Sequence, residues 1–151
     1  MNKEDGRVIS NFVNQAINNE DITIYGTGKQ TRSFCYIDDT LNAIMSIMNN
    51  NENINAPINI GNPEEIEIKE VAELVKKMTN SKSNIILCNR MEDDPPRRKP
   101  DISKAIKYIN WKPSISLENG LKKCIKYYIN ERNKISSFKF NFFREDYEHN
   151  V

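Results

Sequence analysis

Residues 21–37, DITIYGTGKQTRSFCYI, decide the class of fold. Asp21–Tyr25 alternates apolar and polar side chains as a short strand does, and Gly26-Thr27-Gly28 supplies a turn. Thr31–Ile37 predicts a second extended segment. On the amino-terminal side, Val8–Asn18 has the apolar spacing of a helix. Helix and strand patterns therefore alternate, which favours an α/β or α+β arrangement of layers.

The same alternation continues toward the carboxyl terminus. Periodicity predicts two strands, Pro57–Ile60 and Asn84–Leu87, and three helices, Ile68–Met78, Asp101–Ile109 and Leu117–Asn130, the last capped by Ser116. The Asn-rich residues 49–55 and the proline-rich residues 90–100 are expected to be loops. We therefore expect one unit over residues 1–132 and a polar and aromatic tail over 133–151, for which disorder is one interpretation.

Asp38 and Asp39 open a further predicted helix, which runs to about Asn49. Its apolar face would be made by Leu41, Ile44, Met45 and Met48. Two adjacent carboxylates can form a general acid–base pair, but a helix cap accounts better for acidic residues just before an apolar periodic run. Trp111 is expected to pack in the core.

The composition argues against several classes of function. With 22 basic and 21 acidic residues the net charge is +1, so we expect no bulk attraction to nucleic acid or to an anionic membrane. The three cysteines lie far apart without CxxC spacing, which predicts free, buried or half-buried thiols and suits a reducing compartment. With one histidine, His149, near the end of the chain, neither a His-based metal site nor a Ser/His/Asp triad is expected.

The hydropathy pattern bears on membrane contact. No run of about eighteen apolar residues is present, so we expect no transmembrane helix. The polar and acidic residues Met1–Gly6 are unlike a signal peptide, and an anchor would have to lie upstream. The default expectation is a cytoplasmic location, or the Golgi lumen if such an anchor exists.

A set of short motifs in a fixed order carries a resemblance to a known family. The motifs are DGRVISNF (5–12), IYGTGKQTR (24–32), YIDD (36–39), NIGNPEE (59–65), DDPPRRKPD (93–101) and WKP (111–113). Over about residues 4–130 the chain resembles the carboxyl-terminal half of extended short-chain dehydrogenase/reductases that act on nucleotide sugars. Several of the motifs are most similar to those of UDP-glucuronate decarboxylases, while the YG, YxxD and NIG elements are shared with dTDP-glucose dehydratases and UDP-galactose epimerases.

The resemblance implies an α/β fold that supplies the substrate-binding lobe and the last strands and helices of a Rossmann-type enzyme. The missing amino-terminal Rossmann part would hold NAD and a catalytic Tyr-x-x-x-Lys. The family oxidises the sugar at C4, loses CO2 from the β-keto acid and returns the hydride to give UDP-xylose. This chain has no GxGxxG turn, so we assign it no catalytic, cofactor-binding or metal-binding residue and expect it to be inactive alone.

The resemblance also implies which residues contact the substrate. Arg32 and either Arg98 or Arg97 would bind the diphosphate, for which a forked guanidinium is suited. Tyr25 would stack on the uracil ring, as aromatic side chains stack on nucleic-acid bases. Without the resemblance, the simpler interpretation is three solvated arginines and a strand tyrosine that packs in the core.

Further candidate positions follow from the same motifs. Arg7 and Val8 enter the first helix, where unpaired N–H groups favour anions, and would lie along the nucleotide. Asn59 would hydrogen-bond substrate or nearby backbone. Asp94 or Asp101 would bind ribose, with capping of the following helix as an equal alternative for Asp101.

Three interpretations of function stay open at this point. The first is the UDP-sugar-binding half of an NAD-dependent UDP-glucuronate decarboxylase with a homodimeric parent. Its partners would be a UDP-sugar and an amino-terminal Rossmann half, which belongs to the same chain or, if the gene is split, to a separate one. The second is the same part of a dTDP-glucose 4,6-dehydratase or UDP-sugar 4-epimerase, and the third is a non-catalytic nucleotide-sugar-binding module. Without the Rossmann sheet, Pro57–Ile60 would be an edge strand and apolar helix faces would lie open to water.

Overall fold

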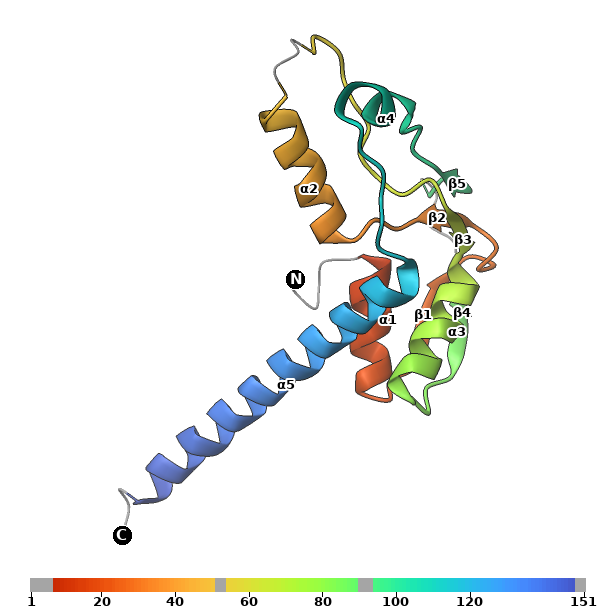
Figure 1. Ribbon diagram of the computed structural model, residues 1–151. Helices are drawn as coiled ribbons and strands as arrows, with labels where there is room; N and C mark the ends of the chain where they lie inside the picture. Colours follow the sequence, from red (N-terminus) through yellow and green to blue (C-terminus); the bar gives the residue numbers. More distant parts are fainter. Residues whose placement is uncertain (1–6, 51–53, 90–93, 149–151) are drawn as a thin grey trace.

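The computed structural model describes residues 7–50, 54–89 and 94–148, with side chains described as far as residue 134. It is an α/β structure with five helices and two small sheets in this part of the chain (Figure 1). The first sheet is a parallel pair, β1 (Ile22–Tyr25) and β4 (Ile85–Cys88), with Ile22 opposite Ile85. The second has the order β3–β2–β5.

Three helices pack around the β1–β4 pair to form the main core. They are α1 (Val8–Ile17), α3 (Ile68–Thr79) and α5 (Leu117–Glu148). The buried side chains come from both ends of the chain: Phe12, Val13, Ala16, Ile22, Ile24, Ile68, Val71, Ala72, Val75, Leu121, Ile125 and Tyr128. Only the first part of α5 lies against this body, and the rest projects away from it (Figure 1).

A second, smaller cluster joins α2 (Ile37–Met48) to α4 (Ser103–Ile109). Its buried members are Ala43, Ile102, Ala105 and Trp111, which confirms Trp111 as a core residue. The opposite face of α2 has the predicted apolar residues, but all of them are exposed: Leu41, Ile44, Met45 and Met48. Within the described residues, therefore, nothing covers the apolar face of α2.

The β3–β2–β5 sheet is built from very short strands. β3 (Glu65–Glu67) runs antiparallel to β2 (Thr31–Ser33), with Arg32 opposite Ile66. β5 (Arg97–Arg98) runs parallel to β2, with Arg32 opposite Arg98. Paired residues on neighbouring strands extend from the same face, so this register assigns each side chain of the sheet to one of two faces.

Most of the predicted elements are confirmed. The helices predicted over Val8–Asn18, Ile68–Met78 and Asp101–Ile109 correspond to α1, α3 and α4, and the strands over Asp21–Tyr25 and Asn84–Leu87 to β1 and β4. Gly26 and Gly28 have φ of 88° and 78°, which suits the predicted glycine turn. Ser116 accepts the N–H of Asn119 at 3.4 Å and so caps α5.

Other predictions about single elements are wrong. Pro57–Ile60 forms no strand, because a strand needs a hydrogen-bonded neighbour and neither described sheet supplies one; Ile58 and Ile60 pack against the second cluster instead. The extended segment Thr31–Ile37 is a strand only to Ser33, since Ile37 already begins α2. The predicted loop over residues 90–100 contains β5, and the final helix continues past Asn130 to Glu148. The division at residue 132 stays a prediction.

The predicted helix cap at Asp38 or Asp39 is also wrong. The residue before α2 is Tyr36, which makes no side-chain cap, and Asp39 lies inside the first turn. The Asp39 carboxylate is buried and accepts the Ser114 N–H and hydroxyl at 3.1 and 2.9 Å and the Ile115 N–H at 2.9 Å. Asp38 forms an exposed ion pair with Lys123 of α5 at 2.8 Å. The two carboxylates therefore point to different partners and fasten α2 to the carboxyl-terminal segment.

Candidate functional site

Arg32, at the centre of β2, is held in place from two sides. Its guanidinium donates a hydrogen bond to the Thr31 carbonyl at 2.6 Å and forms an ion pair with Asp94. The Arg32 side chain is 13% exposed, so the cation is largely enclosed. Asp94 thus neutralises the buried charge, which an arginine in this setting requires.

The register of β5 separates the two candidate arginines. Arg98 is the partner of Arg32 across the parallel ladder, so both side chains extend from the same face of the sheet. The two strands that carry them are neighbours, and neighbouring strands lie about 4.8 Å apart. Arg97 is the partner of Thr31 and extends from the other face. Arg98 is exposed, and no carboxylate pairs with it in the part of the chain that the structure describes. Two arginines from segments far apart in sequence are therefore ladder partners on one face of the sheet.

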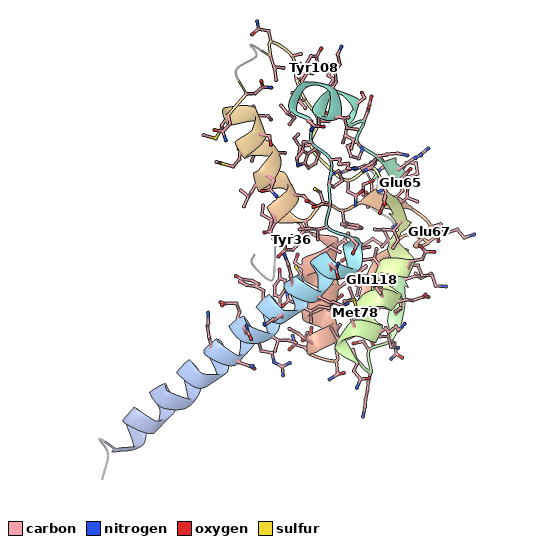
Figure 2. All side chains as sticks on the ribbon, viewed as in Figure 1. Tyr36, Glu65, Glu67, Met78, Tyr108 and Glu118 are labelled. Atoms are coloured by element: carbon pink, nitrogen blue, oxygen red, sulfur yellow. The ribbon has the colours of Figure 1, made fainter. Side chains whose placement is uncertain are left out.

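Glu65 lies on β3 (Figure 2). It occupies the opposite face of the sheet and binds Arg97 with both carboxylate oxygens. Arg97 Nε donates to Oε1 at 2.7 Å and Nη2 to Oε2 at 2.5 Å. The Thr31 hydroxyl donates to Oε1 at 2.9 Å, and Lys99 Nζ lies 3.8 Å from Oε2. The Arg97 hydrogen bonds, aided by Thr31 and the nearby cations, lower the pKa of the Glu65 carboxyl to about 2. Glu65 is therefore ionised across the physiological range.

The β5 segment is also fastened to the NIG motif. Asn59 Nδ2 donates to the Asp101 carbonyl at 3.2 Å. A Cβ on Gly61 would lie 2.9 Å from Pro100 Cγ, so only glycine permits this close approach. Asp101 accepts the Ser103 N–H at 2.9 Å at the start of α4, and hydrogen bonds from the Ser103 backbone and side chain lower the pKa of the Asp101 carboxyl. The cap position of α4 is Ile102, which makes no side-chain cap, so Asp101 lies one residue before the cap position and binds the N–H of the first helical residue. Asn59 contacts backbone.

The remaining candidate residues lie on other elements. Tyr25 ends β1, belongs to the other sheet and is 48% exposed, which leaves its ring accessible for stacking; its carbonyl accepts Gln30 Nε2 at 2.5 Å. Arg7 is the residue before α1 and is exposed, whereas Val8 is half-buried and packs against the main core. The structure therefore makes Arg32 and Arg98 ladder partners in one sheet and links Asn59 to the Asp101 carbonyl, while Tyr25 ends a strand of the other sheet.

Sequence reasoning missed Glu65 altogether and treated Asp94 only as a ribose ligand. Both are the counter-charges that orient the arginines, and both lie tens of residues from their partners along the chain. An acidic residue in a short strand carries no signal of which strand will lie beside it. Only the register of the sheet reveals the pairing.

The described residues contain no group of three or more His, Cys, Asp and Glu side chains that could hold a metal ion. In the same ranges, none of the helices combines the length and the apolar character needed to cross a membrane. The free thiols Cys35, Cys88 and Cys124 are half-buried, as predicted, and burial raises the pKa of Cys35 and Cys124.

Comparison with known proteins gives a consistent answer. Residues 1–61 match the model of the NAD dependent epimerase/dehydratase family. Among curated proteins, the chain is 47% identical over 131 residues to UDP-glucuronic acid decarboxylase 1 of Danio rerio, covering 87% of this chain and 31% of that protein. It is 46% identical over 121 residues to UDP-glucuronic acid decarboxylase 3 of Arabidopsis thaliana, covering 80% of this chain and 35% of that protein.

Solved structures show the same relationship. An epimerase from Methanothermobacter thermautotrophicus superposes with a TM-score of 0.82 at 25% identity, over 87% of this chain and 39% of that one. UDP-glucuronic acid 4-epimerase from Bacillus cereus, solved with UDP-glucuronic acid and NAD, gives 0.77 at 28% identity, over 81% and 39%. The chain spans about a third of the length of the curated relatives it matches. In sequence and in fold, this chain is therefore similar to part of the enzymes of the NAD dependent epimerase/dehydratase family.

Proposed function

We propose that this chain is the UDP-sugar-binding part of an NAD-dependent UDP-glucuronate decarboxylase, an enzyme that converts UDP-glucuronate to UDP-xylose and CO2. The choice of this activity within the family rests on the 44–47% identity to UDP-glucuronic acid decarboxylases. The solved UDP-glucose 4-epimerase and UDP-glucuronic acid 4-epimerase are 26% and 28% identical, which favours the decarboxylase over the epimerase.

The observation that carries the proposal is the pair Arg32 and Arg98 on one face of the β3–β2–β5 sheet. A diphosphate carries two negatively charged groups linked through one oxygen, and a forked guanidinium matches each of them with parallel N–H donors. Tyr25, half-exposed at the end of β1, supplies an aromatic face of the kind on which uracil stacks. These residues would bind and orient the nucleotide.

The proposed partner is an amino-terminal Rossmann half, and the exposed face of α2 supports it. Ile37, Leu41, Ile44, Met45 and Met48 are 45–72% exposed, which is unusual for large apolar side chains on one helix of a stable domain. Within the described residues the parallel sheet consists of β1 and β4 alone, whereas parallel strands normally occur in larger, covered sheets. Both features suit a chain that completes its fold against another protein segment.

NAD would be held by that other half. The five glycines of this chain form no GxGxxG turn, so its residues do not fit a dinucleotide site. The cofactor supplies hydride chemistry when bound to the parent, and the residues of this chain would bind the UDP group.

The first experiment is calorimetric titration of the chain with UDP and with uridine. We expect UDP to bind more tightly than uridine, because only UDP reaches the two arginines. Arg98→Gln should weaken UDP binding by about tenfold or more, as expected for charged hydrogen bonds of about 1.5–3 kcal/mol, and leave uridine unchanged. Lys82→Gln, which removes an exposed positive charge from the segment between α3 and β4, is the matched control and should leave both affinities unchanged.

The activity is tested on the natural protein that contains this chain. A decarboxylase releases CO2 from UDP-glucuronate in an NAD-dependent reaction, whereas a 4-epimerase converts the sugar and retains the carboxyl group. Equal binding of UDP and uridine, or wild-type UDP affinity in Arg98→Gln, would contradict the proposed site. Conversion of UDP-glucuronate without CO2 would replace the decarboxylase with the epimerase.

A further inference from the structure

Few backbone hydrogen bonds hold β5, the strand that presents Arg98. β5 consists of two exposed residues, and beyond its two-residue ladder the Thr31 N–H donates to the Pro96 carbonyl at 3.0 Å. The neighbouring residues Pro95, Pro96 and Pro100 have no N–H to donate. Two residues of ladder are too few to specify a register without help from side chains.

Because both residues of β5 are arginines, the side chains on the Arg32 face do not define the register of this strand. A slip of one position in a strand moves every side chain to the other face of the sheet. In β5 such a slip would replace Arg98 with Arg97 beside Arg32, and one guanidinium would take the place of another. The face that carries Arg32 therefore cannot distinguish the observed register from the slipped one.

Glu65, on the other face of the sheet, distinguishes the observed register of β5 from the slipped one. Its carboxylate accepts two hydrogen bonds from Arg97, and the Thr31 hydroxyl fixes one of the same oxygens. The Glu65 side chain is 15% exposed, whereas that of Arg97 is 65% exposed, so the carboxylate is the fixed member of the pair. The slip would bring Arg98 to the Glu65 face in place of Arg97, but it would also move Lys99, whose Nζ lies 3.8 Å from Glu65 Oε2, to the opposite face. Glu65 therefore meets both an arginine and a lysine only in the observed register.

We infer that Glu65 is a positioning residue that holds Arg97 on the far face of the sheet and thereby selects Arg98 to face the diphosphate. This rests on the proposed UDP site. Glu65 would not touch a diphosphate on the Arg32 face, since the sheet lies between them. Its effect on binding passes through the register of β5.

The test is a double-mutant cycle between positions 65 and 98, with UDP affinity as the readout. In the unaltered chain, Arg98→Gln should cost about tenfold in UDP affinity. In the Glu65→Gln background, Arg97 can take the place beside Arg32, so Arg98→Gln should cost less than about threefold. A purely structural role for Glu65 would lower stability and leave the cost of Arg98→Gln the same in both backgrounds, which would overturn the inference.

A charge-reversed pair keeps the test independent of any loss of folding in Glu65→Gln. Glu65→Arg with Arg97→Glu restores an ion pair across the same two positions. The full cost of Arg98→Gln should return in this double variant, and failure to return in a folded protein would count against the inference. Wild-type UDP affinity in Arg98→Gln alone would instead remove the proposed UDP site, so the two failures are distinguishable.

Discussion

Replacing Asp39 with alanine would remove the carboxylate that ties α2 to residues 114 and 115. Asp39 is 2% exposed and accepts three hydrogen bonds, two of them from backbone N–H groups. Ser114 is exposed, so water can replace its lost bonds, but Ile115 is half-buried and its N–H would lose its partner. One unpaired buried donor costs about 1–3 kcal/mol, and the lost charged bonds add to it, so we expect about 3 kcal/mol of destabilisation.

The assay is urea unfolding followed by the fluorescence of Trp111, the single tryptophan of the chain. Trp111 is buried at the same junction and donates from its indole N–H to the Asp39 carbonyl at 3.0 Å, so it reports on this contact. Asp38→Ala is the matched control, because Asp38 makes only an exposed ion pair with Lys123 and such pairs contribute little. Unfolding of Asp39→Ala within about 0.5 kcal/mol of the unaltered chain would refute the reasoning.

The dependence of this effect on pH has a definite sign. Burial alone would raise the pKa of the Asp39 carboxyl, but the hydrogen bonds from Ile115 and Ser114 and the charge of Lys123 outweigh burial and lower it. A carboxyl with a lowered pKa in the folded state stabilises the fold above its ordinary value of about 3.9, and the stabilisation is lost as the pH falls further. The difference between Asp39→Ala and the unaltered chain should therefore be constant near neutral pH and shrink below about pH 4.

Three other changes give independent checks. Gly61→Ala should destabilise the chain by about 1–3 kcal/mol in urea unfolding, because its Cβ would lie 2.9 Å from Pro100 Cγ; an unchanged midpoint would show that the contact can relax. Cys124 should react with iodoacetamide more slowly at pH 8 than free cysteine does, since burial raises the pKa of its thiol, and denaturation should abolish the difference. Met45→Asp, on the exposed face of α2, should leave the stability of the chain alone unchanged but prevent its association with an amino-terminal Rossmann half; loss of stability instead would mean that this face is covered within the chain.

Sequence reasoning predicted well the elements that the local periodicity of apolar residues specifies. α3 is an example, since Val71 and Val75 are buried and Leu74 and Met78 pack beside them, as the spacing predicts. The failures come from pairing between distant segments. β5 and β3 exist only because β2 lies between them, and the Thr31–Glu65 bond spans 34 positions of the chain.

Asp39 shows how a correct local signal can point to the wrong contact. An acidic residue near the start of a helix predicts a cap, but the partner that satisfies Asp39 lies 75 positions away. In the candidate site, too, local sequence named the candidate residues, and pairing between distant segments decided how they are arranged. The motif resemblance proposed Arg32 and left Arg97 and Arg98 as rivals, and the register of β5 separates the rivals by face. Whether Arg98 contacts a diphosphate stays a prediction.

The main core has a consequence for the way the chain is synthesised. Phe12 and Val13 from its beginning pack in the same cluster as Leu121, Ile125 and Tyr128 from near its end. A ribosome adds roughly 5–20 residues per second, so the amino-terminal helix waits several seconds before the residues that cover it emerge. During that interval a nascent chain keeps its apolar side chains open to chaperones and proteases. Yield in a cell should therefore depend on how fast the last helix is delivered as well as on the stability of the finished fold.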